Sequence, residues 1–331
     1  MDPKNKTATG QLRKKISSSS EISSLMTVFT ALVILIIFFS LSSPYFFSVT
    51  VFMNIGMYAA IVGTLACSMT LINVSGNIDI SGGSQIAIVG MVTAVLIRSN
   101  ALPLWLCIIL GILTGSLCGA VNGFFITTLK LNAFITTIAT MQSFRGIAYL
   151  ISKGQTLVIS NPAFKFFGRG YISIIPFTLI MLIAFNLLFH FITRHTVFGR
   201  TIYMIGGNAQ ASFLSGIRVQ RTKFILYAIN GTMAGFAGIM LASQSGAGLP
   251  MAAMNTNMLA LSAVILGGAG LSGGRGTILG TFIGVMVLST LNTGMTMLSI
   301  SSFWQDVIIG LVLLISVSID AMKSGSLKRK I

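Results

Sequence analysis

Very few side chains of this 331-residue protein have the chemistry of a catalyst. It contains 5 acidic residues and 2 histidines, and His190 and His195 both lie at the end of one apolar run. We find no zinc-protease spacing and no nucleophile–base arrangement. No lysine follows a glycine, so the phosphate-binding loop of ATPases is missing. We therefore expect no catalytic, cofactor or metal site here, and any ATP and Mg²⁺ must be bound by another chain.

Polar residues suited to binding a neutral, hydroxylated solute are more numerous. Amide side chains both donate and accept hydrogen bonds, as a hydroxyl group does. An ion carrier would instead need paired carboxylates or a histidine relay. A single asparagine in an apolar helix also commonly bonds a neighbouring helix. The residues predicted as candidates for a solute path are Asn73, Asp79, Asn122, Asn132, Thr136 and Gln142.

Asp79 has two interpretations. A carboxylate among apolar residues is a functional-site hypothesis by default. An Asp just before an apolar run also caps the free N–H groups of a helix start. The sequence leaves both open.

Arg145 and Asp306 are two further charged residues inside apolar runs. Both lie near the same expected end of their runs, so an ion pair between them is predicted, which would offset the cost of each charge in lipid. The alternative for Arg145 is a side chain that extends to the membrane interface.

The elements that must position these residues are membrane-spanning helices. Hydrophobic residues make up 54% of the chain and charged residues 8%, which excludes a soluble globular enzyme and a nucleic-acid binder. A span needs about 20 apolar residues, so an all-α integral membrane protein with about ten transmembrane helices, some broken, is predicted. The apolar runs cover residues 25–41, 51–73, 84–98, 101–126, 131–151, 174–193, 224–244, 257–270, 277–299 and 303–321.

The basic residues give the orientation. With both termini in the cytoplasm, 16 Lys and Arg lie inside and 4 lie outside, as the positive-inside rule requires. The predicted organisation is a polar cytoplasmic tail over 1–24, one transmembrane domain over 25–321 and a basic cytoplasmic tail over 322–331. Anionic lipid headgroups on the cytoplasmic side of the membrane would attract these basic residues.

Two connecting loops are long. The outer loop, 152–173, has the length to touch an external partner. The inner loop, 194–223, mixes apolar and basic residues, which predicts short amphipathic helices that lie against another protein or on the lipid surface.

Glycine patterns indicate close packing and breaks. Glycines recur every fourth residue at 111, 115, 119 and 123, and again at 276, 280 and 284, which predicts helix faces in backbone contact. Gly-rich polar stretches at 73–83 and 267–274 interrupt apolar runs. Each is interpreted either as non-helical backbone inside the membrane or as a short turn, with a turn favoured for the second.

Several motifs resemble one family. They are Phe198-Gly199-Arg200, Ile205-Gly206-Gly207-Asn208-Ala209, Leu214-Ser215-Gly216-Ile217-Arg218, Gly76-Asn77-Ile78-Asp79-Ile80-Ser81, Ala133-Phe134-Ile135-Thr136-Thr137 and Leu271-Ser272-Gly273-Gly274-Arg275-Gly276. Together they resemble the permease subunits of bacterial ABC sugar importers of the ribose, arabinose and xylose type, over roughly residues 45 to 320. The stretch 132–142 is similar to the arabinose permeases, which favours a pentose. Asn77 and Asp306 depart from the family pattern.

The resemblance implies an inner-membrane permease that imports a monosaccharide. By the same resemblance, this chain itself binds neither ATP nor Mg²⁺. The resemblance implies a separate ABC ATPase, a periplasmic sugar-binding protein and a second permease subunit, identical or closely related. It also implies that the inner loop seats in the ATPase, through Phe198, Gly199, Arg200, Gly206, Gly207, Asn208, Gly216 and Arg218. The alternative function is an ion-coupled secondary transporter of a small neutral solute.

Overall fold

The structure is a computed structural model that describes residues 25–270 and 272–323. The predicted tail 1–24 and most of the predicted tail 322–331 lie outside these residues. Within the described part nearly all regular structure is helical, which confirms the all-α class.

A helix forms at each of the ten apolar runs. These helices are Leu25–Ser42, α2 (Val49–Val74), α3 (Gly82–Ser99), α4 (Leu104–Thr127), α5 (Ala133–Ser152), α7 (Phe177–His195), α10 (Val219–Ser245), α11 (Thr256–Leu266), α12 (Ile278–Met297) and α13 (Ser302–Lys323).

Seven of these helices are long and apolar enough to cross a membrane, so the structure supports a multi-pass protein without establishing ten spans. The other three are α5, α11 and α13. With 11 residues, α11 is about 16 Å long, about half of a bilayer core of roughly 30 Å. In α13 the described apolar stretch, Ser302–Ile315, is shorter than the other spans, and α5 carries several polar residues and Arg145.

The long loops contain short elements. The outer loop forms β1 (Leu157–Val158), α6 (Pro162–Arg169) and β2 (Tyr171–Ile172), and the inner loop forms α8 (Val197–Gly207) and α9 (Ala209–Leu214). Strand β1 pairs antiparallel with β4 (Ala247–Gly248), and β2 pairs with β3 (Ile175–Pro176). Asn161, Thr196 and Asn208 start the three short helices, because each side-chain oxygen accepts a backbone N–H of the first turn.

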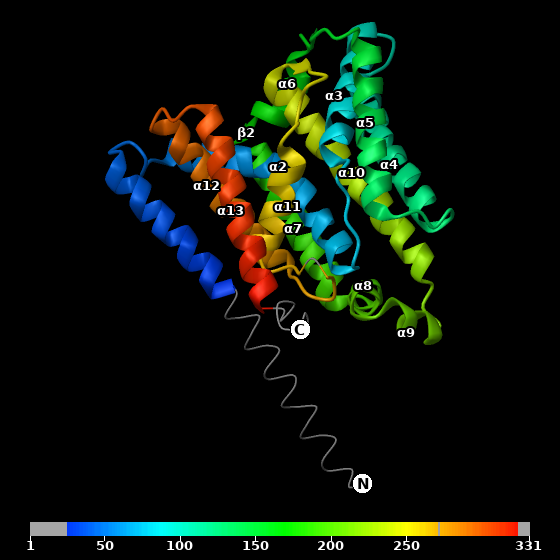
Figure 1. Cartoon of the computed structure of the whole chain (residues 1–331). Helices are drawn as coiled ribbons and strands as arrows, with labels where there is room; N and C mark the ends of the chain where they lie inside the picture. Colours follow the sequence, from blue (N-terminus) through cyan, green and yellow to red (C-terminus); the bar gives the residue numbers. More distant parts are fainter. Residues whose placement is uncertain (1–24, 271, 324–331) are drawn as a thin grey trace.

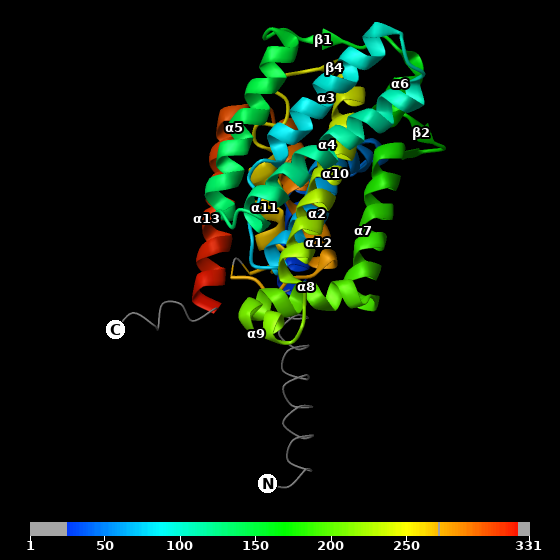
Figure 2. The ribbon, with the colours of Figure 1, turned by 90° about the vertical axis from the view of Figure 1, so that its right-hand side faces the viewer.

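Helices α2 and α10 form the centre of the molecule. Helix α2 packs against α7, α10, α11 and α12, and α10 packs against α2, α3 and α4 (Figures 1 and 2). In an apolar stretch of 18 residues of α2, 89% of the residues are buried, against 28% in the corresponding stretch of α4. Side chains on α2 and α10 are therefore the ones placed to interact inside the protein.

The glycines of α4 bring its backbone against α10. A Cβ added to Gly115 would lie 2.8 Å from the Cα of Gly235, and one added to Gly119 would lie 2.9 Å from the Cα of Gly231. Any side chain at these positions would force the helices apart. The predicted close packing is confirmed here.

The second glycine series is confirmed only in part. Gly280 and Gly284 of α12 lie directly against the backbone of α11. Gly276 is not on that face, because α12 begins at Ile278 and Gly276 has a φ of +143° in the preceding turn. A regular spacing in sequence did not reveal where the helix starts.

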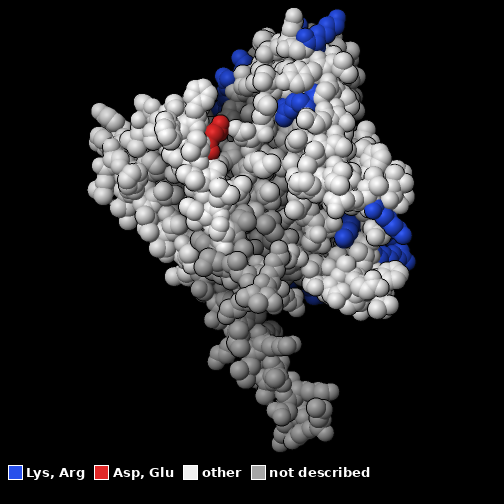
Figure 3. Space-filling view, in the orientation of Figure 1, with Lys and Arg blue, Asp and Glu red and all other residues white. Residues whose placement is uncertain are grey.

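The described chain ends, Leu25 and Lys323, lie at the end of the molecule that carries α8 and α9, and α6 lies at the opposite end (Figure 1). Lys and Arg side chains gather toward the two ends of the face shown in Figure 3, with a largely uncharged band between them. That distribution is typical of a protein that crosses a membrane.

Candidate translocation and coupling sites

The first glycine-rich stretch forms an extended segment inside the protein. Between α2 and α3, residues 75–81 have no helical structure, yet Asp79, Ile80 and Ser81 are buried. Gly76 makes the turn with a φ of +77°. The stretch therefore enters the helix bundle and is covered by protein, as non-helical backbone at membrane depth must be.

Asp79 is fully buried and has three hydrogen-bond donors. Its Oδ1 accepts the backbone N–H of Ser81 at 2.8 Å and the Ser81 hydroxyl at 2.6 Å, and its Oδ2 accepts the Asn230 amide at 2.9 Å. The Asn257 amide donates to the backbone carbonyl of Asp79 at 3.3 Å. The Asp79 carboxyl group therefore accepts hydrogen bonds from both Ser81 and Asn230.

The position of Asp79 bears on the two interpretations of this residue. Ser81 is the residue that precedes the first turn of α3, and Asp79 binds the Ser81 amide from two residues earlier. Asp79 therefore supports the start of α3 and is also bonded to α10 in the middle of the protein.

Asn122 joins the same network through Ser81. The Asn122 and Gln85 amides each donate to the Ser81 hydroxyl oxygen at 2.7 Å. The side-chain oxygens of Asn122, Gln85 and Asn257 are buried and have no partner among the described residues. Such oxygens can accept hydrogen bonds from solute hydroxyls when the protein opens.

The other predicted path residues lie elsewhere. Asn73 is buried in the last turn of α2, and neither atom of its amide has a partner in the described part of the chain. Asn132 caps α5, and the Thr136 hydroxyl donates to the Asn132 carbonyl at 2.8 Å. Gln142 is exposed on α5. Of the six candidates, the structure therefore brings only Asp79 and Asn122 into one network.

Several members of this network were not singled out from the sequence. Asn230 holds Asp79, and the Ser68 hydroxyl donates to Asn230 Oδ1 at 2.7 Å. The Tyr227 hydroxyl donates to the Ile78 carbonyl at 3.1 Å. The available signal was the spacing of Lys223, Tyr227 and Asn230, which lie four and three residues apart on one face of α10.

The predicted ion pair between Arg145 and Asp306 is wrong. The Arg145 guanidinium donates at 2.7 Å to the carbonyls of Pro250 and Ala252, and Asp306 accepts the Asn255 amide at 3.2 Å. The loop between β4 and α11 provides these carbonyls, so Arg145 is satisfied without a carboxylate. Both side chains hold the same loop at different points.

The predicted coupling residues divide into an inward and an outward set. Gly199 is buried, and a Cβ there would overlap the backbone of α7; Phe198 packs on the core formed with α2 and α10. Gly206 is in backbone contact with Val74. These three residues hold α8 against the protein.

The outward set is available to a partner. Arg200, Gly207, Asn208, Gly216 and Arg218 are exposed. Gly207 and Gly216 have open space around the position of a Cβ, and Gly216 has a φ of +83°. The exposed apolar side chains Val197, Met204, Phe213 and Leu214 lie on the same two helices. The amphipathic helices predicted for the inner loop are thus present, with a mixed apolar and basic outer surface.

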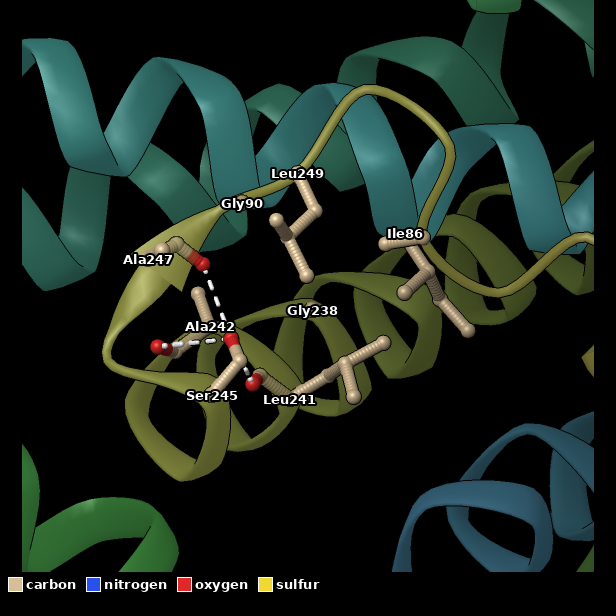
Figure 4. A pocket seen from close by; sticks show the side chains of 9 residues that line it. Ile86, Gly90, Gly238, Leu241, Ala242, Ser245, Ala247 and Leu249 are labelled. Atoms are coloured by element: carbon tan, nitrogen blue, oxygen red, sulfur yellow. Dashed lines mark hydrogen bonds between the residues drawn. The ribbon is translucent and has the colours of Figure 1, made fainter. Parts of the chain in front are cut away.

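Two hollows lie toward the opposite end. Ile86, Gly90, Gly238 and Leu249 are among the residues that surround a space of about 10 Å³ where α10 turns into β4 (Figure 4). That volume is no more than one water molecule requires, so it does not hold a sugar. A more open hollow of about 560 Å³ is lined by Arg98, Asn100, Thr156, Val158, Ser160 and Asn161.

Comparison with known proteins finds similar permeases. The chain is 38% identical over 299 residues to the ribose import permease protein of Bacillus subtilis (strain 168), covering 90% of this chain and 92% of that protein. It is 38% identical over 272 residues to the L-arabinose transport system permease protein of Escherichia coli (strain K12), covering 82% of each chain. It is 30% identical over 352 aligned positions to the xylose transport system permease protein of Haemophilus influenzae, covering 88% of this chain and 94% of that protein.

The family profile described as branched-chain amino acid transport system / permease component matches residues 51–317. This range holds the Asp79 network and α8–α9, and the resemblance to sugar permeases predicted from the motifs is confirmed. The chain therefore belongs to the branched-chain amino acid transport system / permease component family.

Proposed function

We propose that this chain is the transmembrane subunit of an ATP-binding-cassette importer that carries a monosaccharide, a pentose such as arabinose or ribose, across the bacterial inner membrane. The observation that carries this proposal is the near full-length match to permeases named for ribose, L-arabinose and xylose. All three are five-carbon sugars. The comparisons favour this class over an ion-coupled secondary transporter.

In this proposal the energy comes from a separate ATPase that binds ATP and Mg²⁺. The sequence has no phosphate-binding loop. The exposed surface of α8 and α9, with Arg200 and Arg218 beside Phe213 and Leu214, is the proposed seat for that ATPase. A basic and apolar surface can pair with acidic residues around an apolar groove.

The proposed topology has ten spans and cytoplasmic termini. Helices α5, α11 and α13 are the three whose crossing remains a proposal. Support comes from Leu25 and Lys323, which lie at the α8–α9 end of the molecule (Figure 1). The transmembrane domain, 25–321, and the two cytoplasmic tails, 1–24 and 322–331, are part of the same proposal. Anionic lipid headgroups would neutralise the basic residues on the inner face.

A second permease subunit, identical or closely related, is proposed at the outer face of α5. The middle of that face exposes Ala139, Gln142, Ser143 and Gly146, and its ends expose Ile135 and Leu150. The exposed face of α4, in contrast, carries Ile109, Leu113, Leu117 and Phe124, which suit lipid. Small and polar residues are typical of helix contacts and solute paths in membranes.

In this proposal the solute path passes the buried network that contains Asp79 and Asn122. Asn73, Asn132, Thr136 and Gln142 lie outside that network and stay predicted path residues. A periplasmic sugar-binding protein would deliver the sugar at the α6 end, where the open hollow lined by Arg98 lies.

Co-purification tests the proposal. The chain is expressed with the candidate ATPase and sugar-binding protein encoded in the same organism, and the complex is reconstituted in liposomes. ATP hydrolysis should rise when the binding protein loaded with ribose, arabinose or xylose is added, and sugar should enter. Absence of a stable complex with any ABC ATPase would contradict the assignment.

A further inference from the structure

Helix α8 touches both glycine-rich stretches at one point, through Gly206. A Cβ added to Gly206 would overlap the carbonyl oxygen of Val74 and would lie 2.6 Å from the amide nitrogen of Gly274. The same Val74 carbonyl accepts the Gly274 N–H at 2.8 Å. The end of α2, the C-terminal end of α8 and the α11–α12 turn therefore meet through backbone atoms.

Two further glycines complete this contact. A Cβ added to Gly273 would lie 2.7 Å from the Cα of Gly76 and 3.1 Å from the Gly206 carbonyl oxygen. Gly76, Gly273 and Gly274 have φ values of +77°, +81° and +74°, which favour glycine. We call Gly76, Gly206, Gly273 and Gly274 the glycine junction.

Tyr203 binds the same turn from one turn earlier in α8. Its hydroxyl donates to the Gly276 carbonyl at 2.7 Å. Helix α8 thus contacts the α11–α12 turn through a side chain as well as through the glycine junction.

The segment that leaves the glycine junction is also held by α10, residue by residue. Lys223 Nζ lies 3.3 Å from the side-chain oxygen of Asn77, the Tyr227 hydroxyl donates to Ile78, and the Asn230 amide donates to Asp79. Three positions of α10 thus bind three consecutive residues. Because α8, α9 and α10 follow one another in the chain, one continuous unit contacts segment 75–81, at Gly76 through α8 and at residues 77–79 through α10.

We propose that the glycine junction transmits movement of α8 directly to segment 75–81 and so to the Asp79 network. Gly206 is a positioning residue in this scheme, and the inference rests on the proposed function, in which an ATPase binds α8 and α9. Backbone-to-backbone contact leaves no side chain that can change rotamer and absorb a displacement. A shift of α8 must therefore move Val74 and Gly274 together.

Adjacent glycines in α8 separate this role from partner binding. Gly206 is part of the glycine junction, whereas Gly207 is exposed and has open space around its Cβ position. A substitution at Gly206 should impair the transmission of movement from α8 to segment 75–81. A bulky residue at Gly207 should instead impair binding of the ATPase.

The test uses the complete complex with its ATPase and binding protein, carrying Gly206→Ala or Tyr203→Phe. Gly310→Ala is the control, because Gly310 lies on the exposed face of α13 with nothing near its Cβ position. The readouts are the amount of ATPase that co-purifies, the thermal midpoint of the complex, binding-protein-stimulated ATP hydrolysis and sugar uptake.

Gly206→Ala should assemble with normal amounts of ATPase and lose about tenfold in uptake, and Tyr203→Phe should lose a few-fold. The control should match the wild type. Normal uptake in Gly206→Ala would overturn the proposal. If Gly206→Ala fails to fold, Tyr203→Phe decides, and unchanged uptake in that variant would overturn the proposal equally. Failure of the wild-type chain to retain an ATPase would instead reject the proposed function.

Discussion

The amide of Asn230, in the middle of α10, donates a hydrogen bond of 2.9 Å to the carboxylate of Asp79, 151 residues away in sequence. This bond fixes the extended segment 75–81 to the helix that follows the inner loop. The buried centre of the protein and the proposed ATPase seat are therefore joined by one helix.

Asp79→Ala should reduce the free energy of unfolding by about 3 kcal/mol, because Ser81 and Asn230 would lose their buried acceptor. Denaturation of the purified protein in detergent measures this change. Asn132→Ala, which removes an exposed cap of α5, is the matched comparison and should cost about 1 kcal/mol. A loss in Asp79→Ala no larger than that in Asn132→Ala would contradict the predicted contribution of the Asp79 network.

Arg145→Ala should destabilise the protein by about 2 kcal/mol, since two charge-assisted hydrogen bonds to the loop at Pro250 and Ala252 are lost. Asp306→Ala should cost less, because Asp306 is exposed. The double variant should be additive within about 0.5 kcal/mol, as expected for residues without direct contact. A coupling energy above 1 kcal/mol in this double-mutant cycle would support a direct ion pair between Arg145 and Asp306.

Gly119→Leu should prevent recovery of folded protein, because the side chain would enter the backbone of α10 at Tyr227 and Gly231. Gly310→Leu is the control, since nothing lies within 4 Å of a Cβ at Gly310. Size-exclusion profiles of the two variants after detergent extraction give the comparison. Equal recovery of both would argue against the α4–α10 contact.

Gly207→Trp should leave the permease folded and inserted but remove the ATPase from the purified complex, because the indole would occupy the surface proposed to bind it. Gly310→Trp, also at an open exposed site, should retain the ATPase. Normal co-purification and uptake in Gly207→Trp would reject the coupling role of α8. Gly216 is a poorer choice for this experiment, because its φ of +83° makes any substitution strained.

The sequence predicted the helices well, because each is a run of apolar residues long enough to see without any knowledge of its neighbours. The number of spans was harder. Thr256–Leu266 is apolar but short, and Ala133–Ser152 is long but polar, so composition alone does not settle whether either crosses the membrane.

The site was predictable only where a single residue carried the signal. Asp79 stood out as a carboxylate among apolar residues, but its partner Asn230 was one of several asparagines, and periodicity does not show which of them meet. The Arg145–Asp306 pair failed for a related reason. Proximity to the same end of two helices says nothing about the loop carbonyls that lie between them.

The residues predicted to bind the ATPase fall into two different environments. Gly206 and Gly207 are neighbours in sequence, yet one faces the backbone of Val74 and the other is exposed. Only the orientation of α8 separates them, and that orientation is set by its packing through Gly199 and Ile202 on α2 and α7.

The most direct test of the central claim is uptake of labelled arabinose, ribose and xylose by cells that express the chain with its ATPase and binding protein. Uptake is measured with a protonophore present while cellular ATP is kept constant, and again after ATP is depleted. The proposed function predicts that uptake of at least one pentose persists with the protonophore and stops when ATP is depleted. Collapse of uptake with the protonophore at constant ATP would contradict it and favour an ion-coupled transporter.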